Sequence, residues 1–155
     1  MVSHGIVTAA LFLMAGVVWD RAGTYNLGSF GGLAGTAPRL ATLFAVGAFA
    51  SLGLPGLSGF IAEFQIFAGS IAVAPVTAVA LVGILITAAL FLRALQRLFT
   101  GPTRGASRGF GDLRPAELWA VAPLLALSLL IGVLPRPLLG VVEPAAEVVV
   151  QLVGR

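Results

Sequence analysis

Four apolar stretches, each close to or above the length that crosses a lipid bilayer, dominate this chain of 155 residues. A membrane-spanning helix needs roughly 20 apolar residues. Here 59% of the residues are hydrophobic and only 10% are charged, whereas a soluble domain is about 25% charged. A globule of this size has no room to hide so much apolar surface from water. We therefore predict an all-α fold, a polytopic transmembrane helix bundle of about four spans. The predicted spans are residues 1–19, 38–70, 76–99 and 115–134, followed by a tail over 135–155.

The second apolar stretch is too long for one straight span and contains a cluster of helix-breaking residues. Gly53, Pro55, Gly56 and Gly59 fall within seven positions. Proline removes a backbone donor and glycine frees the backbone dihedrals, so the cluster predicts two half-helices broken within residues 53–59. Broken backbone inside a bilayer is tolerated only where neighbouring helices or water satisfy its freed polar groups.

The arginines indicate how the spans are oriented. Five of them crowd the connection between the third and fourth spans, and two flank the connection between the first and second. The connection between the second and third spans carries no charge. By the positive-inside rule, the two Arg-bearing connections face the cytoplasm. These arginines are Arg93, Arg97, Arg104, Arg108 and Arg114 in the first group, and Arg21 and Arg39 in the second.

Several classes of function are disfavoured by the composition. The isoelectric point near 11.1 reflects basic residues that are all arginine, while the net charge is only +3. Because no arginine stripe alternates with aromatic residues, we expect no nucleic-acid partner. The absence of cysteine excludes disulfides and thiolate metal sites. Without a metal-ligand pattern or an acid/base constellation, we expect no catalytic residues, no metal and no cofactor in this chain.

Glu63 is the most informative ionisable residue, because it lies just after the break inside an apolar stretch. A carboxylate at membrane depth costs several kcal/mol unless it is protonated, paired or wetted. The functional interpretation is a proton or ion relay, since buried carboxylates can exchange protons near neutral pH. The alternative is a side chain that snorkels to the interface or bonds to the freed backbone at the break.

His4 is the only histidine and the second candidate. Imidazole titrates near neutrality, which suits proton transfer inside a bilayer. A histidine this close to the first residue also fits an ordinary interfacial position. We predict proton transfer for Glu63 and His4, and the tail residues 141–153 are compatible with a short interfacial helix.

Several motifs resemble one family of membrane proteins. The pattern Leu-Pro-Gly-Leu-Ser-Gly-Phe-x-x-Glu-Phe over residues 54–64 is specific and is similar to the discontinuous helix of the antiporter-like subunits of proton-pumping NADH-quinone oxidoreductase, complex I. A glutamate at the position of Glu63, where related subunits carry lysine, resembles the subunit M (chain 4) type. Supporting similarities are His4-Gly5, Ala10–Leu13, Gly31–Ala34, Asp112-Leu113 and Gly132–Pro137.

The resemblance implies a role that composition does not show. Such subunits have fourteen helices and move protons along a central hydrophilic axis, driven by electron transfer from NADH to quinone elsewhere in the complex. The resemblance implies that Glu63 matches the acidic residue of the broken helix and that His4 matches a histidine of the preceding helix on that axis. The implied partners are the other membrane-arm subunits, the lipid bilayer and protons, in the inner (plasma) membrane. NADH and quinone are bound by other subunits of the complex.

The resemblance covers this chain but only the last third or so of such a subunit. The earlier helices of such a subunit, with their key glutamate and two lysines, have no counterpart here. The chain contains no lysine at all. We therefore expect a C-terminal fragment or truncated gene product that does not pump protons alone. Two other interpretations stay open. One is a related subunit of a multisubunit Na⁺/H⁺ antiporter or membrane-bound hydrogenase. The other is a small structural membrane protein, which would tolerate Glu63→Gln.

Overall fold

Helices form all the regular structure in the computed structural model, which describes residues 1–153. The α-helices are α1 (Val2–Ala22), α2 (Leu33–Thr36), α3 (Pro38–Ser51), α4 (Ser58–Val73), α5 (Val82–Phe99), α6 (Pro115–Val133) and α7 (Arg136–Val153). Short 3₁₀ segments lie at η1 (Leu27–Ser29), η2 (Pro75–Leu81) and η3 (Gly105–Ser107).

The predicted spans correspond to the longer helices. Within the described part of the chain, three helical segments are long and apolar enough to cross a membrane: α1, α6 and the continuous segment of η2 with α5. The remaining predicted span is discontinuous, because α3 ends at Ser51 and α4 begins at Ser58. The prediction of an all-α polytopic bundle with one broken helix is therefore confirmed.

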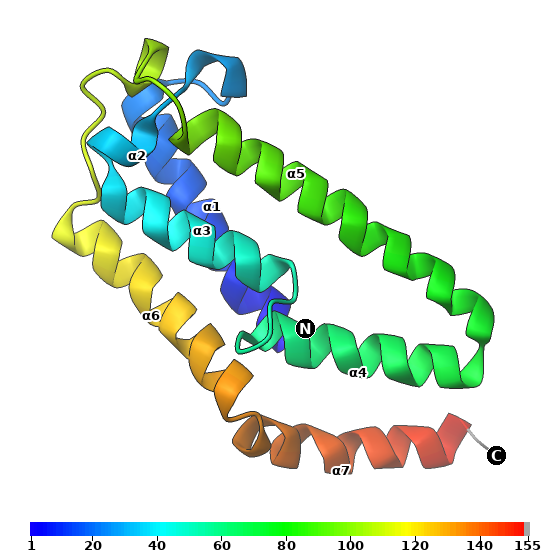
Figure 1. Ribbon diagram of the computed structural model, residues 1–155. Helices are drawn as coiled ribbons and strands as arrows, with labels where there is room; N and C mark the ends of the chain where they lie inside the picture. Colours follow the sequence, from blue (N-terminus) through cyan, green and yellow to red (C-terminus); the bar gives the residue numbers. More distant parts are fainter. Residues whose placement is uncertain (154–155) are drawn as a thin grey trace.

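The centre of the bundle is formed by α1, α3 and α6, which run alongside one another (Figure 1). Met14 of α1, Leu40 of α3 and Val121 of α6 are almost completely buried there. The α5 helix leans away from this centre and joins it near its last turn, where the rings of Phe44 and Phe99 are 5.2 Å apart. Most of α4 and α5 therefore stands off from the core.

The connections after α1 and after α5 pack against each other at one end of the bundle. The backbone N–H of Gly32 donates to the carbonyl of Thr100 at 2.9 Å. The N–H of Gly31 donates to the Ser107 hydroxyl at 3.0 Å, and Ser107 is fully buried. These long connections thus have fixed structure, and both lie on the same side, as alternating spans require.

Arg21 joins the ends of α1 and α6 at this same side. Its guanidinium donates to the Glu117 carboxylate at 2.6 Å and to the Asp112 carbonyl at 3.1 Å. The guanidinium also lies 5.7 Å from the centre of the Phe110 ring. A planar guanidinium presents several donors in a fixed fork, so one side chain contacts both α6 and the connection that precedes it.

The tail forms a longer helix than the sequence suggested. α7 begins at Arg136, five residues before the predicted start of the interfacial helix at residue 141. Pro137 lies in the first turn, where a helix has no use for a backbone N–H, so it does not prevent helix formation. Its predicted interfacial position stays a prediction, and residues 154–155 of the tail lie outside the described part.

Candidate functional site

The break in the second span is closed by backbone hydrogen bonds rather than left open. Gly53 has a left-handed φ of +65°. The N–H of Leu54 donates to the carbonyl of Phe49 at 3.1 Å, and that of Gly53 donates to Ala50 at 3.4 Å. This pair of bonds is the Schellman motif, which ends helices at a left-handed glycine. Pro55 follows immediately, where the helix cannot continue.

Two glycines allow the start of α4 to pack tightly against its surroundings. A Cβ on Gly59 would collide with the carbonyl oxygen of Ala50, and one on Gly132 of α6 would collide with the backbone of Gly56 and Leu57. Gly59 was predicted to be part of the break, but it is the second residue of α4. Its role is therefore close approach of the two half-helices rather than interruption of the helix.

Three serine hydroxyls connect α4 to its neighbours at this point. The Ser58 hydroxyl lies 2.8 Å from that of Ser3 on α1 and 2.8 Å from that of Ser128 on α6. Ser58 is 1% exposed, and Ser128 is fully buried. The start of α4 is thus enclosed by protein between α1 and α6, while Leu54 and Pro55 within the break are exposed. Protein contacts on one side of the break therefore help to satisfy irregular backbone at membrane depth.

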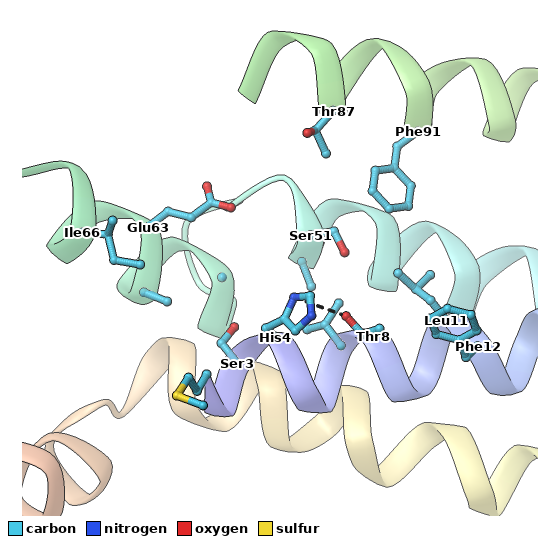
Figure 2. A pocket seen from close by; sticks show the side chains of 15 residues that line it. Ser3, His4, Thr8, Leu11, Phe12, Ser51, Glu63, Ile66, Thr87 and Phe91 are labelled. Atoms are coloured by element: carbon cyan, nitrogen blue, oxygen red, sulfur yellow. Dashed lines mark hydrogen bonds between the residues drawn. The ribbon is translucent and has the colours of Figure 1, made fainter. Parts of the chain in front are cut away.

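A cleft of about 540 Å³ opens beside the break, and both predicted proton-transfer residues line it (Figure 2). His4 reaches it from α1, Glu63 from α4, Ser51 from the end of α3 and Thr87 from α5. A second cavity of about 280 Å³ shares Ser51, Glu63 and Thr87 with the first. Glu63 therefore lies where two cavities meet, among polar side chains from three other helices.

The Glu63 carboxylate folds back over the break. A Cβ built on Gly53 would collide with its Oε2 atom, so the carboxylate rests on the glycine's Cα, which is no hydrogen-bond donor. The N–H of Gly53 is directed to Ala50 instead. The partly buried carboxylate lines the cleft.

His4 is exposed to the cleft rather than buried in the core. Its Nδ1 atom lies 3.5 Å from the hydroxyl of Thr8, one turn further along α1. The cleft thus brings together two titratable groups that are 59 positions apart in the chain. Only the fold places them together, since α1 and α4 meet through the serine contacts at the break.

Sequence reasoning missed the neutral polar residues of this region. Ser51 and Thr87 line both cavities, and Ser3, Ser58 and Ser128 form the buried hydroxyl chain. Serine and threonine are common in transmembrane helices, where they bond across helix interfaces. Their positions alone gave no signal, except that Ser51 and Ser58 flank the break.

Comparison with known proteins gives the family. A family model described as "NADH:quinone oxidoreductase/Mrp antiporter, TM" matches residues 1–90. NADH-quinone oxidoreductase subunit M of Mycobacterium tuberculosis is 39% identical over 156 residues, which cover 100% of this chain and 28% of that protein. This chain thus spans well under a third of that relative.

Two solved structures share the fold. Respiratory complex I from Thermus thermophilus with bound NADH matches with a TM-score of 0.86 and 37% identity, over 99% of this chain and 32% of the other. The Mrp complex from Dietzia sp. DQ12-45-1b matches with a TM-score of 0.78 and 24% identity, over 88% and 34%. At that lower identity, the second likeness concerns the fold alone. The chain belongs to the NADH:quinone oxidoreductase/Mrp antiporter transmembrane family.

Proposed function

We propose that this chain works as part of a proton-translocating membrane subunit, of the subunit M type, in a respiratory NADH-quinone oxidoreductase. The observation that carries the proposal is the cleft beside the broken helix, which Glu63 and His4 line together. A carboxylic acid and an imidazole are side chains that bind and release protons under physiological conditions. An ionisable residue at membrane depth is by default a functional one.

The geometry suggests how protons cross this region. Glu63 faces two cavities that share its side chain, so a proton can reach its carboxylate from either. Ser51 and Thr87 border both cavities and offer hydroxyl groups that donate and accept hydrogen bonds. His4 lines the larger cavity and serves as the second proton-binding group. Glu63 and His4 act here as relay groups, and no bond other than those to protons changes.

Electron transfer belongs to other subunits in this proposal. NADH and quinone are bound elsewhere, this chain has no independent catalytic site and no cofactor of its own, and it sits in the inner (plasma) membrane with the other membrane-arm subunits. The relatives named as NADH-quinone oxidoreductase subunits support this assignment.

A second candidate is a related subunit of a multisubunit Na⁺/H⁺ antiporter or membrane-bound hydrogenase. The family model, whose description names both NADH:quinone oxidoreductase and Mrp antiporter, keeps it open. The sequence identity of 37% to the complex I chain favours the first proposal. NADH-driven acidification of vesicles in sodium-free buffer separates the two, because an antiporter needs a counter-ion gradient.

The proposal is tested by Glu63→Gln and Glu63→Asp in the complete subunit, assembled in its complex. Gln keeps the size and hydrogen-bonding capacity of Glu but cannot exchange a proton, so NADH-driven ΔpH formation should fall sharply. Asp retains the proton site on a shorter stem and should pump better than Gln. Assembly is checked separately by native gel, and it should survive because a neutral group is cheaper to bury than a charged one. Wild-type pumping in an assembled Gln variant would exclude the relay role.

A further inference from the structure

The two half-helices of the broken span both begin without a side-chain cap of their own. The residue before α3 is Ala37 and the residue before α4 is Leu57, and neither supplies a side-chain cap. The first backbone N–H groups of a helix have no partner within the helix and need an acceptor from elsewhere. For α4, which begins inside the predicted span, water is not freely available for this purpose.

Both acceptors come from one neighbouring segment, α6 and the connection that leads into it. The Asp112 carboxylate accepts from the N–H groups of Arg39 and Leu40, at 3.0 and 3.1 Å, at the start of α3. The Ser128 hydroxyl on α6 accepts from the N–H of Ser58 at 3.4 Å, at the start of α4. Thus each half-helix is capped from outside its own sequence, and both caps are carried by the same segment.

The cap on α4 is continuous with the cleft. Ser58 bonds through its hydroxyl to Ser128 on one side and to Ser3 on the other. Ser3 precedes His4 and lines the same cleft as Glu63. Because a buried hydroxyl without a partner is costly, the buried Ser58 and Ser128 hold each other in place. Gly132, one turn further along α6, packs on the backbone that leads into α4.

We propose that Ser58 and Ser128 are positioning residues for proton transfer, through which α6 sets the placement of α4 and hence of the Glu63 carboxylate. Glu63 is five residues after Ser58 on the same helix, so a shift of Ser58 moves the carboxylate within the cleft. The inference rests on the proposed function of Glu63 as the relay, but its structural part can be tested without any pumping assay. Neither serine contacts the transferred proton in this scheme.

The structural test is amide hydrogen exchange in the complete assembled complex, comparing Ser128→Ala with Asp112→Ala. Ser128→Ala should speed exchange by about fivefold in the first turn of α4 and leave the first turn of α3 unchanged, because loss of a cap opens the helix end locally. Asp112→Ala should do the reverse. Unchanged exchange in α4 of the Ser128 variant, or equal changes at both helix ends, would overturn the proposal.

The functional test uses Ser58→Ala, Ser128→Ala and the double variant in proteoliposomes, with Ser70→Ala on the same helix as a matched control. Each single variant should lower the ratio of protons pumped to NADH oxidised by about twofold or more and displace its pH profile, while NADH oxidation continues. The double variant should lose less than the sum of the two single losses, because both single variants remove the shared Ser58–Ser128 contact. Additive losses, or wild-type pumping ratios and pH profiles, would contradict the proposal.

The results also distinguish failure of the positioning proposal from failure of the relay proposal. If the Ala variants do not assemble, Ser58→Cys decides, because it keeps the side-chain volume but bonds only weakly; a wild-type ratio and pH profile in that variant would refute the positioning role. If Glu63→Gln stops pumping while the serine variants behave as wild type, the positioning proposal fails and the relay proposal stands. If Glu63→Gln pumps normally, the relay proposal fails, whatever the exchange data show.

Discussion

At the scale of single residues, Gly53 meets two requirements at once. Its φ of +65° lies in the left-handed region, which costs other residues about 1–2 kcal/mol. Its Cα also supports the Glu63 carboxylate, leaving no space for a Cβ. Gly56 has a positive φ of +95°, but a Cβ added to it would have open space. Both glycines have a backbone conformation that other residues adopt at a cost, but only Gly53 also contacts the carboxylate. Comparing substitutions at the two positions therefore distinguishes the effect of backbone strain from the effect of that contact.

Gly53→Ala should reduce proton pumping more than Gly56→Ala in the assembled complex. Both changes strain the backbone, but only the first pushes the Glu63 side chain out of its position. Pumping is measured as NADH-driven ΔpH in vesicles and divided by the amount of assembled complex on a native gel. Equal losses in the two variants would mean that strain alone matters and that the carboxylate is free to move.

Asp112 is the second residue with a specific electrostatic setting. Partial burial by itself raises the pKa of its carboxyl. Hydrogen bonds from the backbone N–H groups of Arg39, Leu40 and Leu113, with the Arg39 charge nearby, outweigh this and hold the pKa below its ordinary value of 3.8. A carboxyl with a lowered native pKa contributes stability above its unfolded pKa and loses that contribution as the pH falls through the native pKa.

Asp112→Ala should therefore destabilise the protein by about 1 kcal/mol near neutral pH, with a gap to wild type that narrows below pH 3.8. Thermal unfolding of the detergent-solubilised complex, followed over a series of pH values, measures this gap. Asp112→Asn is the control, because its amide oxygen still accepts a hydrogen bond but does not titrate. The difference in stability between the Asn and Ala variants should stay constant with pH. A stability gap between wild type and the Ala variant that widens in acid would contradict a lowered pKa for Asp112.

At the scale of elements, α6 packs against the break and contacts the start of α4, the helix that carries Glu63. α6 approaches so closely at Gly132 that any side chain there would meet the backbone of Gly56 and Leu57. The sequence indicated where the helix would break, because proline and glycine act locally. It gave no indication that α6 would cover the break, since that depends on packing between segments about 75 positions apart.

Gly132→Ala should destabilise the assembled protein by about 1–3 kcal/mol, the usual cost of extra volume in a close-packed contact. The matched control is Gly140→Ala in α7, which meets nothing within 4 Å and should be neutral or slightly stabilising because alanine favours helix. The midpoint of thermal unfolding reports both changes. An equal effect of the two substitutions would show that α6 does not bear on the break.

At the scale of the whole molecule, the structure gives the alternating arrangement of connections on which the orientation argument depends. The connections after α1 and after α5 bond to each other, and the connection between α4 and α5 lies at the opposite end of α5 (Figure 1). The arginines of the first two connections place them in the cytoplasm by the positive-inside rule. This orientation stays a prediction.

Single-cysteine labelling tests the orientation, because the chain has no cysteine of its own. Arg108→Cys replaces an exposed side chain in the connection after α5. Val76→Cys replaces a side chain that is 77% exposed in η2, at the opposite end of α5. An impermeant thiol reagent added outside intact cells should modify the Val76 variant and leave the Arg108 variant unmodified until the membrane is opened. The reverse pattern would invert the topology. Ser107 is unsuitable for this purpose, since it is buried and bonded to Gly31.

The helical spans, the approximate place of the break and the two candidate proton-transfer residues can be read from the amino-acid sequence alone. Each of these follows from local composition: apolar length, a Pro/Gly cluster and the rarity of ionisable groups such as Glu63 in apolar segments. The start of the tail helix was less well predicted, since a proline in a first turn does not stop a helix.

Which polar groups meet depends on how distant helices pack. This packing brought His4 and Glu63 to one cleft, directed the Gly53 N–H away from the carboxylate, and supplied helix caps from Asp112 and Ser128. A serine in an apolar helix carries the same local signal whether it faces lipid or a partner. Its role is set by the packing of distant segments, because a buried hydroxyl is stable only where another helix provides its hydrogen bond.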